Sequence, residues 1–213
     1  RRKDARIFAL AYPEWSQTYN PVFLGRHGDP LAAAERVFSV FPLEHEYYRG
    51  QSKLFFYNLL RLLAGTGKAF NLIDIRLCVT DDEVLAYASD LSDDRAAKYE
   101  ISKQMAQLGK KRLETFTGLH NALSDYDHPL LNSYAPDIII EDVMNERGIV
   151  YFNLPANRYP LLAPAVGKIV LQHVKAVGAL RQIDRRRYDQ TPFAVNIDEL
   201  NRFAFEELVP ALN

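Results

Sequence analysis

Residues 193–203 read F-A-V-N-I-D-E-L-N-R-F, and this stretch decides the fold that the sequence predicts. Its apolar beginning, Phe193 to Ile197, is typical of a strand buried in a sheet. Two adjacent carboxylates, Asp198 and Glu199, follow directly and open a predicted helix. Ligands in open α/β sheets bind outside the carboxyl ends of the strands. Acids placed here can therefore bind a metal ion and contact a water molecule. The alternative is an ordinary buried strand followed by a helix whose first turn favours acids.

Two further strands complete the predicted sheet. Arg6 to Tyr12 is almost continuously apolar, and Gly148 to Leu154 is rich in β-branched and aromatic residues. A long helix is expected from Tyr159 to about Leu180. Strand, helix and strand in this order form a βαβ unit, which closes right-handed into a parallel sheet. We expect the strand that begins at Arg6 to join the same sheet.

The segment between the first two strands is much longer than the roughly dozen residues that a crossover needs. Apolar spacing and capping residues predict that it is all-helical. The expected helices cover residues 31–41, 43–63, 69–79, a helix opened by the capping box Thr80-x-x-Glu83, and residues 92–108, 110–123 and 137–145. The economical architecture is therefore an α/β core with a parallel sheet and a large helical insertion.

The composition is that of an ordinary soluble globular protein. The chain has 213 residues, of which 48% are apolar and 25% charged, enough for one large domain or two small ones. The formal net charge of −1 predicts no global attraction to nucleic acid, so such binding would need a local basic patch or an oligomeric ring. The single cysteine, Cys78, excludes an internal disulfide and fits a reducing compartment.

No membrane span is expected. The most apolar window, Leu54 to Leu63, contains Asn58 and Arg61 and is far shorter than the roughly 20 residues that a span needs. The chain begins Arg1-Arg2-Lys3, without an initiator methionine or an apolar signal core, so we expect no targeting peptide. We also expect this chain to be cut from a longer protein.

The stretch Gly65-Thr66-Gly67-Lys68 resembles a phosphate-binding loop only superficially. The pattern G-x-x-x-x-G-K-[ST] needs glycine at position 62 and serine or threonine at position 69, where the chain has Leu62 and Ala69. The stretch also follows a predicted helix, whereas a phosphate loop follows a strand. We therefore predict a turn that ends the helix, with Gly65 as its C-cap.

Other groups have both a functional and a structural interpretation, and we favour the structural one for each. The basic triplets 110–112 and 185–187 either contact phosphate or are solvated surface. The aromatic residues Tyr47, Tyr48, Phe55 and Phe56 either stack bases or pack among helices. The histidines show no metal-ligand spacing with one another or with Cys78, so no zinc site is expected, and His173 is expected to be packed or hydrogen-bonded.

The order of these segments resembles the coupling-protein ATPases of conjugative type IV secretion systems, the TraD/TraG-type DNA-transfer proteins. Tyr19-Asn20-Pro21 is similar to the segment where the nucleotide-binding core of that family passes into its all-α domain, and Asp29-Pro30 resembles the start of that domain. Ile149 to Leu154, followed by Arg158-Tyr159-Pro160, is similar to the return strand and the helix after it. Residues 193–203 resemble the family's Walker B strand, although Asn196 and Leu200 depart from its usual pattern.

The resemblance implies an α/β fold, namely part of a RecA-like P-loop ATPase core with a parallel sheet and a large inserted all-α domain. Residues 1–28 would form the first part of the core, residues 29–146 the inserted domain, and residues 147–213 the second part with the Walker B strand. The chain contains no Walker A loop, which is expected upstream of Arg1. This chain alone is therefore expected to be inactive as an ATPase.

The resemblance also implies roles for the acid pair. By matching position, Asp198 would hold Mg²⁺ through its water shell, and Glu199 would orient or deprotonate the water that attacks the γ-phosphate of ATP. ATP and Mg²⁺ are thus the expected cofactors of the full-length protein. Arg185, Arg186 and Arg187 are weaker candidates for contacting DNA. The alternative for Glu199 is a purely structural role as an acidic first-turn residue.

The function implied is an ATP-driven translocase that delivers DNA or DNA–protein complexes to a type IV secretion channel during conjugation. The expected partners are single- or double-stranded DNA, relaxosome or secreted substrate proteins, and components of the channel. A homo-hexamer at the cytoplasmic face of the bacterial inner membrane is expected for the full-length protein. Two alternatives are open: a helical module that binds a substrate or accessory protein without ATPase activity of its own, and a DNA translocase of the FtsK or HerA type.

Overall fold

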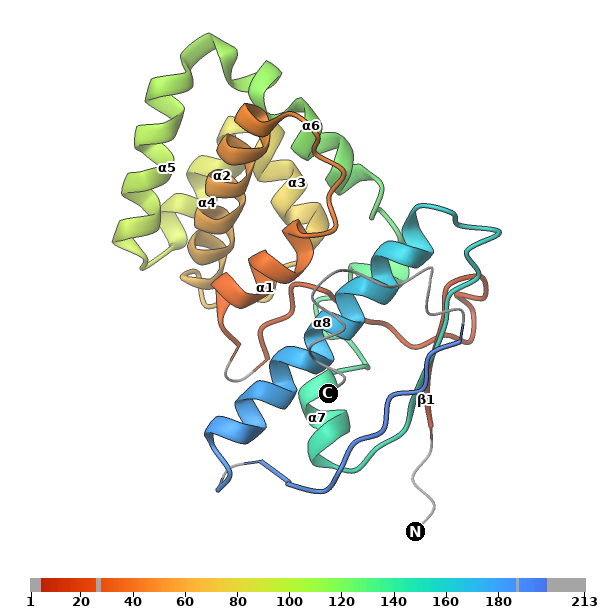
Figure 1. Ribbon diagram of the computed structural model, residues 1–213. Helices are drawn as coiled ribbons and strands as arrows, with labels where there is room; N and C mark the ends of the chain where they lie inside the picture. Colours follow the sequence, from red (N-terminus) through yellow and green to blue (C-terminus); the bar gives the residue numbers. More distant parts are fainter. Residues whose placement is uncertain (1–4, 26–27, 187, 199–213) are drawn as a thin grey trace. The chain divides into compact units, whose positions relative to one another are not determined.

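The computed structural model describes residues 5–25, 28–186 and 188–198. The chain divides into two compact units. The first, here called the strand unit, comprises the residues up to Tyr19 together with those from Pro136 onward. The second, the helical unit, is Asn20–Ala135, so it is inserted in the sequence between the two parts of the strand unit (Figure 1).

Helices prevail in both units. The helical unit contains α1 (Pro30–Phe38), α2 (Glu46–Ala64), α3 (Leu72–Thr80), α4 (Asp82–Leu91), α5 (Arg95–Leu108), the 3-10 turn η1 (Gly109–Lys111), α6 (Arg112–Ser124) and the 3-10 turn η2 (Pro129–Leu131). The strand unit contains β1 (Arg6–Ala9), α7 (Ile140–Asn145), β2 (Val150–Asn153) and α8 (Leu162–Ile183). None of the described helices combines the length and the apolar character needed to cross a membrane.

Helix α2 is the centre of the helical unit, because it packs against α1, α3, α4, α5 and α6 (Figure 1). Its second half is apolar on most sides, and Phe55, Phe56, Leu59 and Leu60 are fully buried. The ring of Phe55 stacks on the ring of Phe116 from α6, with 4.5 Å between centroids. The interpretation of Phe55 and Phe56 as helix packing is therefore confirmed.

The helix boundaries follow the capping residues. The side chains of Asp29 and Asp94 accept hydrogen bonds from amides in the first turns of α1 and α5. Gly65 caps the end of α2, so the prediction of a helix-ending turn, and not a phosphate loop, is confirmed. The predicted capping box at Thr80 is wrong, because Asp81 caps α4 and Thr80 is still the last residue of α3.

Asn20 joins distant parts of the helical unit. Its buried side-chain amide donates to the carbonyl oxygens of Phe70, at 2.8 Å, and of Ser133, at 3.0 Å. Its side-chain oxygen accepts from the backbone N–H of Val22 at 3.0 Å. A buried polar side chain needs such partners, and here they connect the first residue of the unit to its last segment.

In the strand unit, β1 and β2 form a parallel pair, with Arg6 opposite Val150 and Ala9 opposite Asn153. The prediction that the strand beginning at Arg6 lies in the same parallel sheet as the segment 148–154 is confirmed. The rings of Phe8 and Phe152 pack across the pair, with 5.4 Å between centroids. One face of the pair is thus covered by buried aromatic packing.

Tyr19 and His173 form a polar contact within the core of the strand unit. The Tyr19 hydroxyl lies 3.0 Å from Nδ1 of His173 on α8, and the Tyr19 ring meets the Phe152 ring edge-on. The Tyr19 side chain is fully buried. The prediction of a packed or hydrogen-bonded His173 is therefore confirmed.

The predicted α/β core, a RecA-like parallel sheet with an inserted all-α domain, is wrong. Within the described residues the sheet has only two strands, each of four residues, and the chain is mostly helical. Residues 193–197, the predicted third strand, have no regular secondary structure. Asn196 interrupts their apolar run, and Val195 is 44% exposed, whereas a strand of a parallel sheet is buried on both faces.

A physical reason for the small sheet is that the chain itself closes the outer edge of β1. The backbone N–H of Ile7 donates to Oε1 of Gln17 at 2.7 Å, and that of Ala9 donates to Oγ of Ser16 at 2.8 Å. The N–H of Gln17 in turn donates to the carbonyl of Ile7 at 2.8 Å. These backbone groups are the ones that a further strand would need, so no strand can pair on this side.

Candidate functional site

The acid pair of the sequence is only partly described. Asp198 lies on an exposed bend that follows the irregular residues 193–197. It is therefore not held at the tip of a strand, which is where the sequence placed it. Glu199, the predicted catalytic residue, lies outside the described residues. The roles of Asp198 toward Mg²⁺ and of Glu199 toward water stay predictions.

The basic run lies in the turn that follows α8. Arg185 and Arg186 are both exposed there, and Arg187 lies outside the described residues. Exposure suits a solvated turn as well as a contact with phosphate, and both interpretations stay predictions.

The segment that leads to Asp198 is held by contacts that the sequence did not suggest. Arg181, near the end of α8, is buried and donates through its guanidinium to the carbonyls of Asp189 and Thr191. The Asp189 carboxylate accepts from the Thr191 backbone N–H at 2.6 Å and from Nε of Arg147 at 2.8 Å. The hydrogen bonds from Thr191 lower the pKa of Asp189 most, and the bond from Arg147 lowers it further. The pKa therefore lies well below its ordinary value.

Arg147 lies in the turn before β2 and has a positive φ of 56°, which is rare for a residue other than glycine. Its contact with Asp189 therefore joins the turn before β2 to the segment after α8. An arginine and an aspartate separated by so many residues leave no pattern in the sequence. This explains why the contact could not be predicted.

The helical unit contains a pocket between α3 and α6, with a volume of about 180 Å³. It is lined by Val79, Thr80, Leu113, Phe116, Thr117 and His120. Val79 and Phe116 are buried, whereas Leu113 is 66% exposed. The pocket therefore has a buried apolar part and a leucine that is open to a ligand. Sequence analysis missed this site because its two helices lie far apart along the chain.

The hydroxyl groups around the pocket are bonded within their own helices. Thr117 donates to the carbonyl of Leu113 at 2.6 Å, and Thr80 donates to the carbonyl of Arg76 at 3.3 Å. Because these groups have partners, the surface that remains for a ligand is mainly apolar.

Arg112 supports one end of the same helix pair. Its guanidinium forms an ion pair with Asp82 and donates to the carbonyl of Val79 at 3.1 Å. Its side chain is only 12% exposed, and this burial lowers the pKa of the guanidinium. The interpretation of residues 110–112 as solvated surface is therefore wrong for Arg112, although Lys110 and Lys111 are exposed.

The described part of the chain holds no group of three or more histidine, cysteine, aspartate or glutamate side chains that could bind a metal ion. Cys78 is buried, and this burial raises the pKa of its thiol to about 12, so the thiolate needed for metal binding or nucleophilic attack is strongly disfavoured.

Comparison of the chain with protein-family models, with curated proteins and with solved structures found no match.

Proposed function

We propose that this chain is part of a conjugative DNA-transfer coupling protein and that its helical unit binds a protein partner, either a relaxosome component or a secreted substrate. The observation that supports the proposal is the insertion of a compact helical unit between two segments that pair as parallel strands. The same order of segments underlies the resemblance to coupling proteins. In this proposal the complete protein is a homo-hexamer at the cytoplasmic face of the inner membrane.

The pocket between α3 and α6 is the proposed contact for the partner. Its volume of about 180 Å³ is smaller than the ~300–1,000 Å³ typical of small-molecule sites, so it suits one apolar side chain of a protein. Leu113 adds exposed apolar surface beside it. Side chains that fill a well-packed, desolvated pocket near the centre of an interface contribute most of its binding free energy.

The proposal is tested by placing a charge at the pocket. We expect Leu113→Asp to weaken binding of a purified accessory or substrate protein of the same transfer system about tenfold or more, because the contact would bury an unpaired carboxylate. Position 113 lies in the first turn of α6, where an acid suits the helix dipole, so the fold should persist. Isothermal titration calorimetry measures the affinity.

Leu54→Asp is the matched control. Leu54 lies on α2, is 49% exposed and does not line the pocket, so its replacement should leave the affinity unchanged. Equal affinities of the Leu113→Asp variant and the wild-type chain would exclude the pocket as the contact. If no accessory or substrate protein bound the wild-type chain, the role of the helical unit would be excluded as well.

The proposed activity of the complete protein is the ATP-driven movement of DNA or a DNA–protein complex toward a secretion channel. Asp198 is proposed to contact Mg²⁺ through its water shell, and Glu199 to activate the attacking water. Asp198 is exposed, so its carboxylate is accessible to a hydrated ion. Arg185, Arg186 and Arg187 are proposed as contacts for DNA phosphates.

A further inference from the structure

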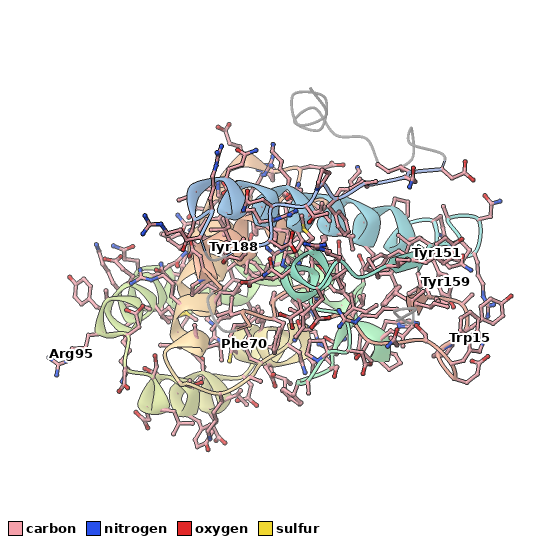
Figure 2. The ribbon with its side chains drawn as sticks, turned by 90° about the horizontal axis from the view of Figure 1, so that it is seen from below. Trp15, Phe70, Arg95, Tyr151, Tyr159 and Tyr188 are labelled. Atoms are coloured by element: carbon pink, nitrogen blue, oxygen red, sulfur yellow. The ribbon has the colours of Figure 1, made fainter. Side chains whose placement is uncertain are left out.

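Exposed aromatic side chains gather at one end of the strand unit. Tyr12 and Trp15 follow β1 and are 46% and 53% exposed, and Tyr151 on β2 is 60% exposed. Tyr159 follows β2. Figure 2 shows the labelled Trp15, Tyr151 and Tyr159 close together in its view. Large aromatic rings are seldom left open to water in such a group without a binding role.

The backbone brings the two aromatic turns next to each other. The N–H of Leu10 donates to the carbonyl of Asn153 at 3.2 Å, so β1 and β2 end side by side. From there one turn leads to Tyr12 and Trp15, and the other leads to Arg158 and Tyr159. This is the carboxyl end of the parallel pair.

Both turns are held by hydrogen bonds. The N–H of Tyr12 donates to the carbonyl of Ala9 at 2.9 Å, and Ser16 accepts from the N–H of Ala9 at 2.8 Å. In the second turn, the N–H groups of Arg158 and Tyr159 each lie 3.0 Å from the carbonyl of Pro155. The rings are therefore carried by ordered backbone, which reduces the entropy lost when a ligand binds.

The rings have the geometry of a stacking surface. The Tyr12 and Trp15 rings are stacked, with 5.2 Å between centroids and 21° between planes. The guanidinium of Arg158 lies 5.5 Å from the centroid of the Tyr159 ring. An unpaired base can extend such a stack, and the planar arginine can stack on a base or meet a phosphate.

We propose that Tyr12, Trp15, Arg158 and Tyr159 form a stacking platform for unpaired bases of single-stranded nucleic acid. The platform deepens the proposed function and rests on it, because it names a DNA-contacting surface for the proposed transfer protein. Duplex DNA does not suit the platform, since its base faces are already stacked. Glu14 and Arg158 are the charged residues of the two turns, so their charges balance. Stacking therefore supplies most of the affinity, and Arg158 adds one contact with a phosphate.

The only tryptophan of the chain is Trp15, so tryptophan fluorescence reports on the platform alone. The full chain is titrated with a single-stranded oligothymidylate, with an oligouridylate of the same length and with a duplex of that length. The expected result is quenching by the single strands and little quenching by the duplex. Equal effects of the DNA and RNA strands mean recognition of unpaired bases, and a stronger effect of DNA means that the 2′-hydroxyl is disfavoured; both support the platform.

Two variants and a control test the named residues. Tyr12→Ala should weaken the binding of oligothymidylate about tenfold, because it removes one stacked ring. Arg158→Ala should reduce the slope of log K against log salt by about 0.7, the value for one phosphate contact on a single strand. Tyr87→Ala, which removes a tyrosine that is 62% exposed on α4 in the helical unit, should change neither quantity.

Absence of quenching, equal quenching by the duplex, or quenching that Tyr12→Ala leaves unchanged would overturn the platform. Oligothymidylate binding to a Leu113→Asp chain separates this proposal from the previous one. That variant should keep the full quenching, since Leu113 belongs to the helical unit. A chain that binds its protein partner and shows no quenching would exclude the platform alone.

Discussion

Thr18 and Asp137 join the two segments of the strand unit that border the helical unit. The backbone N–H and the hydroxyl of Thr18 both donate to Oδ2 of Asp137, at 2.9 and 2.7 Å. The N–H of Ile138 donates to the carbonyl of Thr18 at 3.0 Å. The hydrogen bonds donated by Thr18 lower the pKa of Asp137, because they favour the charged carboxylate. The bond from the backbone has the larger effect and the bond from the side chain the smaller one.

This lowered pKa predicts a stabilising contribution that depends on pH. A carboxyl group whose pKa is lower in the folded chain stabilises it fully above the ordinary pKa of about 4, and the contribution is lost as the pH falls through the folded-state pKa. Thr18→Val removes the hydroxyl donor, so we expect the pKa of Asp137 to rise toward its ordinary value. At neutral pH the loss should be on the order of 1 kcal/mol, since the pair is exposed.

Two measurements check this prediction. Titration of the Asp137 carboxyl group by NMR gives its pKa, and urea unfolding at several pH values gives the stability. The stability difference between the variant and the wild type should shrink below about pH 4. Thr117→Val is the control, because that hydroxyl bonds only a carbonyl of its own helix. A pKa of Asp137 that does not change in Thr18→Val would contradict the assignment.

At the scale of elements, the end of α2 depends on a close approach to the start of α5. A Cβ atom added at Gly65 would lie 2.4 Å from Oγ of Ser92 and 3.0 Å from the backbone nitrogen of Asp94. The Asp94 carboxylate also forms an ion pair with Arg61 of α2, at 2.9 Å. Glycine at position 65 is therefore required by contact between two elements as well as by the helix end.

Gly65→Ala should consequently destabilise the chain by about 1–3 kcal/mol, the usual cost of an added carbon in a packed site. Gly50→Ala provides the opposite case, since Gly50 lies inside α2 with no atom within 4 Å of the added carbon. That substitution should stabilise the chain by about 0.5–1 kcal/mol through helix propensity. Urea unfolding of both variants measures the difference, and equal stabilities would refute the steric explanation.

The segment 193–197 illustrates the limit of prediction at this scale. Its residue types favour a strand, but a strand also needs a neighbour with free backbone groups. Ser16 and Gln17 occupy those groups along the outer edge of β1, so no strand can pair on that side of the sheet. Instead, Arg181 holds the preceding residues 189–191 through their backbone carbonyls. The side-chain pattern could not reveal either arrangement.

At the scale of the whole molecule, the proposed ATPase activity belongs to the complete protein and not to either unit alone. We expect Glu199→Gln in the complete protein to leave ATP binding intact and to reduce turnover at least a hundredfold, because the amide cannot accept a proton from the attacking water. Radiolabelled ATP binding and phosphate release measure the two steps separately.

Glu207→Gln is the matched control, since it is a nearby glutamate of the same chain outside the predicted motif. It should retain full turnover. Hydrolysis at the wild-type rate in the Glu199→Gln protein would remove Glu199 from the mechanism. The proposed protein-binding role of the helical unit would be unaffected by that outcome, because the pocket lies within Asn20–Ala135.

Local sequence patterns are enough to predict most helices, the turn at Gly65 and the two segments that pair as strands. These features depend on neighbouring residues: apolar spacing, capping side chains and glycine at a helix end. The burial of Phe55 and Phe56 also follows from such a pattern.

The small size of the sheet, the burial of Arg112 and Arg181, the pocket between α3 and α6, and the side-by-side ends of β1 and β2 follow from tertiary contacts. Each of these depends on groups that are far apart in the chain. Their contacts are selected by packing and by the need of buried polar groups for partners, and no local pattern records that selection.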